Sequence, residues 1–246
     1  MPLFNEADKI STTIAGLEQA FSNVGIAPTY IIQDDASTDS SLEVLSTLAQ
    51  RYLNRVEVEQ NSQNRGHGPT VMRAYVRALA LNPEVIVHVD SDGEIDPQAA
   101  VRCALQVIEA DTEAVIGARF DRNSPWHRRA VTRLLRLAIL IFFGVRSDDV
   151  NSPVRAYQSP TLSKLTSFVP ADAVTPHVLL TVLTHKISRE IVYLPAESAS
   201  SSLPADEGST WKSSNRLFGI PTRFLKLVAR AFKELVVFRF AIRRQY

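Results

Sequence analysis

The residues best suited to chemistry are the carboxylates of HVDSDGEIDP, residues 88–97, which directly follow the apolar run EVIV. Such a run predicts a strand, so the acids stand where a strand ends. In an extended segment, side chains at positions i, i+2 and i+4 project to the same side, which lets Asp90, Asp92 and Glu94 converge. Mg²⁺ and Mn²⁺ prefer oxygen ligands of this kind. We therefore predict a metal site at these three residues.

An alternative explanation covers part of this segment. A solvated acidic turn would cap the helix that is expected to begin near Pro97, with Asp96 as its N-cap. Asp96 fits that role, but capping does not require Asp90 and Asp92.

A second acidic cluster, QDDASTDSS at residues 33–41, follows another expected strand. Carboxylates at the opening of a sheet, here Asp34 and Asp35, can accept hydrogen bonds from ribose hydroxyls or base N–H groups. Capping of the next helix explains Ser37 or Asp39 equally well. It does not explain the doubled aspartate.

A third segment, QNRGHGPTVMRAY, places Asn64, Gly66 and Gly68 directly before an expected helix. The free N–H groups of that helix N-terminus would be able to face a phosphate. By itself this signal is weak.

The elements that must position these segments alternate along the chain. Short runs rich in β-branched residues predict strands over residues 29–35, 55–61, 84–90, 113–119 and 190–196. Apolar residues three and four apart predict helices over residues 6–24, 40–53, 68–81 and 97–110. This alternation predicts an α/β fold with a mostly parallel sheet and helices on both faces. Ligands of such sheets bind beyond the carboxyl ends of the strands, where both acidic clusters stand.

The pattern changes after about residue 120. One long helix with an apolar face is predicted over residues 124–146, and its basic residues are Arg128, Arg129, Arg133 and Arg136. Residues 216–244 predict a basic amphipathic helix broken near Pro221. We expect a first domain over residues 1–200, followed over residues 201–246 by an acidic, serine-rich loop and this C-terminal helix.

Composition excludes several classes of protein. A chain of 246 residues with 45% apolar content can fill a sizeable core. Its 27 basic and 26 acidic residues give a net charge of +1 and no general attraction to nucleic acid. The single cysteine, Cys103, favours a reducing compartment. With no signal-peptide pattern, and no apolar stretch near the roughly 20 residues of a spanning helix, we expect a cytoplasmic protein.

Six segments, taken together, resemble the motifs of the family 2 glycosyltransferases of GT-A fold in both order and spacing. They are PLFNE at 2–6, DDASTD at 34–39, NRGHG at 64–68, DSDGEIDP at 90–97, GAR at 117–119 and DVNSPVRAY at 149–157. The likeness is greatest to polyprenyl-phosphate sugar transferases of the dolichol-phosphate mannose synthase type. It covers roughly residues 1–200.

The resemblance implies a role for each matching residue. The nucleotide-sugar site is assigned to Pro2, Asn5, Glu6, Asp35, Asn64, Gly66 and Asp90. The metal that bridges the donor diphosphate, Mg²⁺ or Mn²⁺, is assigned to Asp90, Asp92 and Glu94. The catalytic residues are Asp149, Arg155 and Arg119, and the acceptor phosphate is assigned to Arg119, Arg129 and Arg133. Arginine suits phosphates because its planar fork pairs two oxygens at once, although a surface ion pair with Asp149 or Asp148 would also explain Arg155.

The expected function is metal-dependent, non-processive transfer of a sugar, with inversion, from a UDP- or GDP-sugar to a polyprenyl-phosphate-like acceptor. A phosphate acceptor arrives anionic and needs arginines, whereas a hydroxyl acceptor needs a general base such as Asp149. Two alternatives stay open: transfer to a saccharide or protein hydroxyl, and a nucleotide-sugar binder without activity. Residues 126–145 either lie peripherally on the inner face of a membrane or pack over the active site.

Several features depart from the family. No apolar strand precedes PLFNE, so we expect the sheet to lack its first central strand. The late segment keeps Gly208 and Ser209 of a family pattern but lacks its arginine, and residues 224–246 form at most an interfacial anchor. The histidines show no metal-ligand spacing and are expected to pack or to face solvent; they include His67, His127, His177 and His185.

Overall fold

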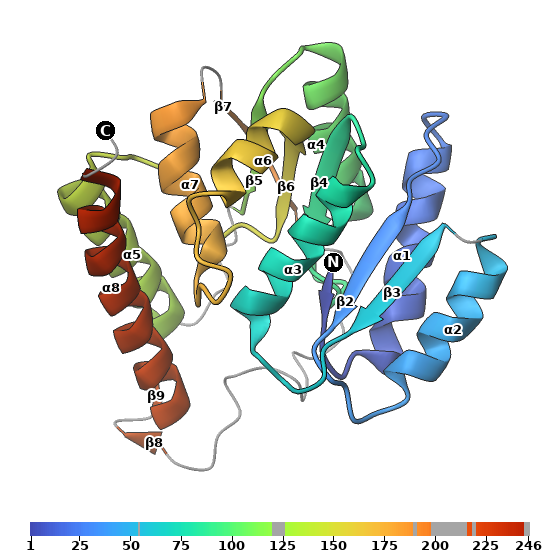
Figure 1. Ribbon diagram of the computed structural model, residues 1–246, viewed down its shortest axis with the longest axis horizontal. Coiled ribbons are helices and arrows are strands. Elements are labelled where there is room, and N and C mark those ends of the chain that lie inside the picture. The colour runs from blue at the N-terminus through green and yellow to red at the C-terminus, as the bar shows by residue number, and fades with distance from the viewer. Residues whose placement is uncertain (54, 120–125, 189–190, 198–215, 218–219, 244–246) are drawn as a thin grey trace.

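The chain forms an α/β fold, seen here in a computed structural model that describes residues 1–53, 55–119, 126–188, 191–197, 216–217 and 220–243 (Figure 1). The helices are α1 (Ala7–Ser22), α2 (Ser41–Arg51), α3 (His67–Ala80), α4 (Pro97–Glu109), α5 (Trp126–Phe143), α6 (Ser159–Thr166), α7 (Pro176–Ile187) and α8 (Thr222–Arg243). The strands are β1 (Pro2–Leu3), β2 (Tyr30–Asp34), β3 (Val56–Gln60), β4 (Val85–Val89), β5 (Ala114–Ala118), β6 (Val154–Gln158), β7 (Ile191–Pro195), β8 (Arg216–Leu217) and β9 (Ile220–Pro221).

The predicted strands form where the β-branched runs stand. Every residue of β2 and of β5 is buried, as expected for central strands covered on both faces. β4 and β7 also lie within their predicted segments. Each predicted helix of the first half forms within one or two residues of its expected ends. The α/β prediction is therefore confirmed.

The strands form two larger sheets and one small pair. The first sheet has the order β1-β2-β3 and is wholly parallel. The second has the order β4-β6-β5-β7, in which β6 runs antiparallel to both β4 and β5 while β5 and β7 are parallel. β8 and β9 pair with each other. The antiparallel β6 makes the second sheet mixed.

The expectation that the first central strand is missing needs a correction. A two-residue strand, β1, lies in register beside β2, with Pro2 opposite Gln33. Its neighbours extend the pairing, because Gln33 N–H donates to the Met1 carbonyl at 2.9 Å and Asp35 N–H donates to the Leu3 carbonyl at 2.8 Å. Among the described strands, β1 pairs with β2 and not with β4. The strand is thus short, and the two sheets separate beside it.

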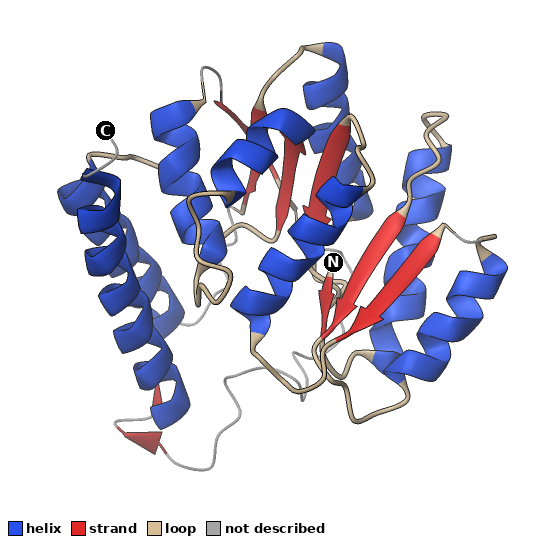
Figure 2. Cartoon of the chain, viewed as in Figure 1, coloured by secondary structure: helices blue, strands red, loops and turns tan. Residues whose placement is uncertain are grey.

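Helices cover both faces of the sheets (Figure 2). One core cluster joins α1, α2 and α4 to strands of both sheets, with Ile10, Ile14 and Ile32 fully buried. A second cluster joins α3, α6 and α7 to the other face and reaches α5 and α8. Packing therefore joins the two sheets, although no described strand of the first sheet pairs with a strand of the second.

α5 and α8 lie side by side at one edge of the molecule, beyond α7 (Figure 1). The rings of Phe143 and Phe238 meet between them, with centroids 6.2 Å apart. The Glu234 carboxylate of α8 also accepts N–H bonds from Val174 at 2.7 Å and from Thr175 at 2.9 Å, directly before α7 begins. The C-terminal helix is thereby tied to the start of α7.

Candidate functional site

The first two loops at the carboxyl ends of the strands are bonded to each other. Asn5, after β1, has a positive φ of 53°. Its side-chain oxygen accepts from Thr38 N–H at 2.8 Å, and its own N–H donates to Ser37 Oγ at 2.9 Å. The predicted nucleotide-binding segment PLFNE therefore lies against the segment that follows β2.

The doubled aspartate holds these loops in place. Asp35 is buried and accepts from the N–H groups of Arg65 and Gly66, both at 2.8 Å. Asp34 accepts from Ser37 N–H and from Gln60 Nε2, both at 3.0 Å. The structure thus gives Asp35 the task of fixing the loop before α3. Its predicted contact with a base or ribose stays a prediction.

The loop before α3 matches the third predicted segment. Gly66 lies at φ 91° directly before the helix, where a side chain would be strained. Asn64 is exposed on the same loop. A Cβ on Gly68 would come within 2.1 Å of the Ala173 carbonyl oxygen, so glycine is needed where α3 meets the segment before α7.

The acidic segment after β4 lies close to the PLFNE loop. Burial and the negative charges of Asp39 and Glu94 raise the pKa of Glu6, against the opposing effect of Lys9. Burial, with the charges of Asp90, Glu94 and Glu6, raises the pKa of Asp92 to about 7. Glu6 and the acids of the DSDGE segment therefore share one crowded negative region.

The backbone of this segment is well fixed. Asp90 N–H donates to the Pro153 carbonyl at 3.1 Å, and Glu94 N–H donates to Asp92 Oδ1 at 3.0 Å. Asp96 caps α4, because its Oδ1 accepts from Gln98 N–H at 3.0 Å, which confirms its predicted role as N-cap.

This donor set fits the metal that the resemblance implies. Burial, together with the negative charges of Asp90, Glu94 and Glu6, raises the pKa of Asp92 so that its carboxyl holds its proton up to about pH 7. A divalent cation would relieve this repulsion, and carboxylate oxygens are suitable ligands for it. Asp90 and Asp92 are the residues that would hold such an ion, but the predicted convergence with Glu94 is not seen: the chain turns at residues 91–93 instead of running extended, and Glu94 is exposed. Among the described residues, these three acids do not form a group whose ligand atoms all lie within 4.8 Å of one another.

Three histidines join Asp90, a group that sequence analysis missed. His88 Nε2 lies 3.0 Å from Asp90 Oδ1 and 3.1 Å from His177 Nε2, and His67 Nε2 lies 3.9 Å from Asp90 Oδ1. His67 begins α3, His88 is in β4 and His177 is in the first turn of α7. No sequence spacing could have revealed a group assembled from three separate elements.

Arg119 and Asp149 form an ion pair beside this group. Arg119 Nε lies 3.1 Å from Asp149 Oδ2, and Arg119 Nη2 donates to the Asn151 carbonyl at 3.1 Å. The Asp149 side chain is 7% exposed and that of Arg119 is 31% exposed. Burial opposes ionisation of Asp90, but the hydrogen bond from His88 and the electrostatic effects of His67, His88 and Arg119 outweigh it and lower the pKa of Asp90.

Arg155 is buried inside the fold. Its side chain is fully buried on β6, so the alternative of a surface ion pair is wrong. The guanidinium donates to the carbonyls of Ser152 and Val150, both at 3.1 Å, and to Thr181 Oγ1 at 2.8 Å. The structure does not bring Arg155 to the surface of the site, because these internal acceptors hold it inside the fold.

The remaining predicted residues are placed as follows. Pro2 is buried in β1, and Arg133 is exposed on α5. The side chain of Arg129 lies outside the described residues, as do Gly208, Ser209 and most of the predicted acidic loop. Among the helices that the structure describes, none is both long and apolar enough to span a bilayer.

The architecture itself defines a class of protein, an α/β fold with acidic loops gathered at the carboxyl ends of its strands. Solved structures of GT-A glycosyltransferases share it. The chain is similar to glucosyl-3-phosphoglycerate synthase from Mycobacterium tuberculosis, with a TM-score of 0.60 and 17% identity over 96% of this chain and 77% of that one. It is also similar to a mannosyltransferase from Pyrobaculum calidifontis solved with GDP-Man and Mn²⁺, with a TM-score of 0.55 and 14% identity over 96% and 72% of the two chains. These likenesses show the GT-A fold.

Residues 1–162 match the sequence model of glycosyl transferase family 2. Because the match covers more than half of the chain, the protein belongs to glycosyl transferase family 2.

Curated relatives include undecaprenyl-phosphate 4-deoxy-4-formamido-L-arabinose transferases. The protein of Edwardsiella ictaluri (strain 93-146) is 24% identical over 199 residues, which are 81% of this chain and 58% of the relative. That of Sodalis glossinidius (strain morsitans) is 19% identical over 222 residues, which are 90% of this chain and 65% of the relative. The chain therefore spans less than two thirds of the length of these relatives.

Proposed function

We propose that this chain is a metal-dependent, non-processive glycosyltransferase that transfers a sugar from a UDP- or GDP-sugar to a polyprenyl-phosphate-like acceptor, with inversion at the sugar. The observation that carries the proposal is the gathering of Glu6, the Asp90–Asp92 segment and the Arg119–Asp149 pair at one end of the strands. This is the end at which open α/β sheets bind ligands.

The donor half of the proposal rests on charge. When the sugar leaves a nucleotide, negative charge grows on the departing diphosphate. A bound divalent cation would stabilise that charge, and the crowded carboxylates fit such an ion. The mannosyltransferase with the same fold was solved with GDP-Man and Mn²⁺, which supports a similar donor and ion here.

The acceptor half rests on Arg119. Its guanidinium is partly exposed, and it is held in position by the buried Asp149 carboxylate and the Asn151 carbonyl. A fixed guanidinium can orient an anionic acceptor, which needs no proton removed. Asp149 already accepts from Arg119, so it is less suited to act as the general base that a hydroxyl acceptor would need. The undecaprenyl-phosphate relatives support the same choice.

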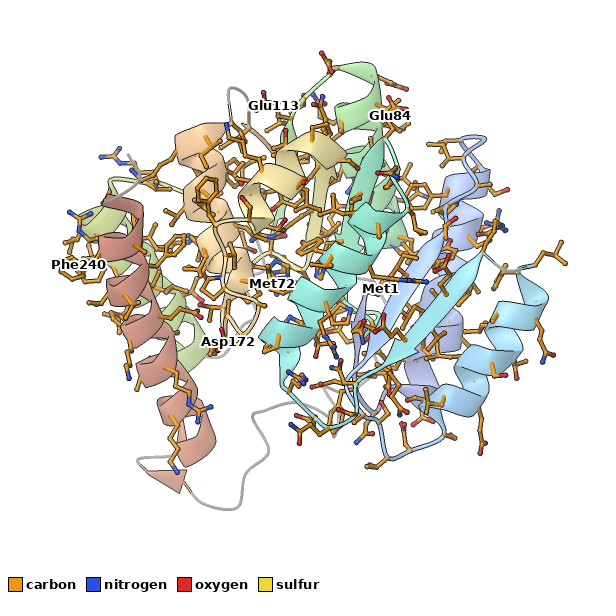
Figure 3. The ribbon with its side chains drawn as sticks, viewed as in Figure 1. Met1, Met72, Glu84, Glu113, Asp172 and Phe240 are labelled. Carbon is orange, nitrogen blue, oxygen red and sulfur yellow. The ribbon has the colours of Figure 1, made fainter. Side chains whose placement is uncertain are left out.

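A lipid acceptor requires access to a membrane, and α5 and α8 provide a suitable surface. On α5, Leu137 is 51% exposed and Ile141 is 66% exposed. On α8, Val237 is 60% exposed and Phe240, labelled in Figure 3, is 61% exposed. Exposed basic residues accompany them on both helices: Arg133, Arg136, Arg230 and Lys233. We propose that this pair of helices, α5 and α8, lies on the anionic inner face of a membrane.

The donor site is tested first by thermal shift. The full chain is screened with UDP and with GDP, each with Mn²⁺, because a ligand that binds only the folded state raises the melting temperature. A shift with one nucleotide identifies the base. No shift with either nucleotide would count against a donor site.

The acceptor is then tested by turnover with a radiolabelled donor sugar and a short-chain polyprenyl phosphate. Label in the organic phase after extraction supports the proposal. A water-soluble product would instead indicate a saccharide or protein hydroxyl acceptor. Nucleotide affinity without turnover would indicate a binding protein.

A further inference from the structure

The histidine group around Asp90 has the composition of a metal site. In the part of the chain that the structure describes, one set of three metal-binding side chains has its ligand atoms within 4.8 Å of one another, and it is His67, Asp90 and His177. Ligands about 2.1 Å from a shared ion stand about 3.0 to 3.4 Å apart. The 3.9 Å between His67 Nε2 and Asp90 Oδ1 closes by a rotation of the His67 side chain, which is 55% exposed.

The contacts among Asp90, His88 and His177 contain more hydrogen-bond acceptors than donor hydrogens. An ionised carboxylate can only accept, so the 3.0 Å contact requires a proton on His88 Nε2. His177 Nε2, 3.1 Å from the same nitrogen, must accept a share of that single hydrogen. Asp90 Oδ1 and His177 Nε2 thus direct lone pairs toward one region that holds one proton. A cation would satisfy both acceptors at once.

Buried polar atoms beside the group also lack partners. Among the described atoms, His177 Nδ1 and the Tyr75 hydroxyl are buried with no hydrogen-bond partner. His177 is 2% exposed, and its ring stands 4.4 Å from that of His88 and 6.2 Å from that of Tyr75, measured between centroids.

We propose that His67, Asp90 and His177 bind a divalent transition-metal ion, so that the cation of this site has two imidazole nitrogens and one carboxylate oxygen among its ligands. Imidazole suits Zn²⁺, Co²⁺ and related ions, whereas Mg²⁺ prefers oxygen ligands alone. The site therefore selects Co²⁺, Zn²⁺ or Mn²⁺ over Mg²⁺. Three protein ligands leave open positions for water or for donor oxygens.

His88 is a positioning residue in this arrangement. Its hydrogen bond to Asp90 fixes the carboxylate from inside the fold, as outer-shell partners do in metal sites. Asp92 and Glu94 add negative charge near Asp90. The inference deepens the proposed function. It rests on that function in one respect, because the ion would lie beside the proposed donor site.

The test measures metal binding by the full chain without nucleotide. Calorimetric titrations compare Co²⁺, Zn²⁺, Mn²⁺ and Mg²⁺, and pulsed electron paramagnetic resonance of the Mn²⁺-loaded protein detects coupling to ¹⁴N. We expect ¹⁴N coupling, together with at least tenfold tighter binding of Co²⁺ than of Mg²⁺. His67→Gln should weaken Co²⁺ binding at least tenfold and reduce the coupling.

Matched variants keep the result interpretable. Removal of the buried His177 can unfold the chain, so the partly exposed His67 carries the test, and His177→Gln is used only if its melting is cooperative. His185→Gln is the control, because His185 bonds instead to the Tyr193 hydroxyl at 2.8 Å. It should bind Co²⁺ as the wild type does.

Three results would overturn the inference: no metal binding without nucleotide, Mn²⁺ bound without ¹⁴N coupling, or unchanged Co²⁺ binding by His67→Gln. Sugar transfer without ¹⁴N coupling would reject this site and leave the proposed function standing. ¹⁴N coupling without nucleotide binding would support this metal site and count against the proposed function.

Discussion

At the scale of single residues, Asp92 carries a clear energetic cost. Its pKa of about 7 in the folded chain lies above the ordinary value of 3.8, because burial and three neighbouring acids oppose its ionisation. The folded state therefore keeps a proton that the unfolded state releases. Asp92 lowers the free energy of unfolding as pH rises from about 4 to about 7, and the loss is complete above that range.

We predict that Asp92→Asn stabilises the metal-free chain at pH 7.5 by roughly 1–2 kcal/mol, less than the full pKa shift implies because the side chain is partly exposed. The gain should vanish below about pH 4. Urea unfolding across this pH range measures it, with the exposed Asp172→Asn as control. An equal gain at pH 4 and pH 7.5 would contradict the explanation.

The two central arginines should respond differently to removal. Arg155→Leu leaves buried carbonyls without donors and should lower the free energy of unfolding by about 3 kcal/mol. Arg119→Ala should leave the fold within about 1 kcal/mol, because Asp149 keeps a bond from the Asn151 N–H at 3.1 Å, but should lower sugar transfer at least tenfold. Chemical denaturation and turnover separate the effects. A stable but inactive Arg155→Leu would support the predicted catalytic role of Arg155.

The acids of this site were predictable and its histidines were not, for a physical reason. Asp90 and Asp92 follow a strand that the sequence displays, which fixes where they lie along the chain, but the turn at residues 91–93 replaces the extended segment that the predicted convergence with Glu94 assumed. His67 and His177 reach Asp90 only because α3 and α7 pack against each other. The burial of Arg155 likewise depends on Thr181, which comes from a helix distant in sequence.

At the scale of elements, the periodic helices and the β-branched strands were predicted well, whereas α7 and β6 were missed. α7 is buried continuously from Pro176 to Thr184, so its sequence shows no polar face by which a helix could be recognised. β6 contains the buried Arg155, which interrupts its apolar run. Both elements are shaped by what surrounds them, which a single sequence does not display.

The junction of α3 with the segment before α7 depends on Gly68. A Cβ there would stand 2.1 Å from the Ala173 carbonyl oxygen and 2.5 Å from that of Val174, closer than real contacts allow. We predict that Gly68→Ala forces the helices apart, lowers the free energy of unfolding by about 1–3 kcal/mol and weakens metal binding through displacement of His177.

Thermal melting and Co²⁺ titration measure the two effects of Gly68→Ala. Gly25→Ala is a control for general destabilisation, because Gly25 has a strained positive φ, which Gly68 does not, and has nothing within 4 Å of an added Cβ. If Gly25→Ala weakened Co²⁺ binding as much as Gly68→Ala does, the junction would not be the cause.

At the scale of the whole molecule, α7 links the site to the proposed membrane surface. Its first turn supplies His177, and the segment before it is held by Glu234 of α8. α8 in turn packs on α5, and both helices present apolar side chains outward. A membrane surface that positions α5 and α8 would thus also position the start of α7.

The pair of helices α5 and α8 should bind anionic membranes through its exposed apolar side chains. The double variant Leu137→Glu, Ile141→Glu should lower binding to anionic liposomes at least tenfold, because inserting each side chain contributes about 1.5–3 kcal/mol and the added charges repel anionic headgroups. The matched control is Val76→Glu on α3, since Val76 is 61% exposed and Ile141 is 66% exposed. In flotation assays the wild type and the control should rise with anionic vesicles and less with neutral ones. A wild type that stays wholly in the soluble fraction would remove the membrane surface from the proposed function, and its lipid acceptor would then have to be delivered in another way.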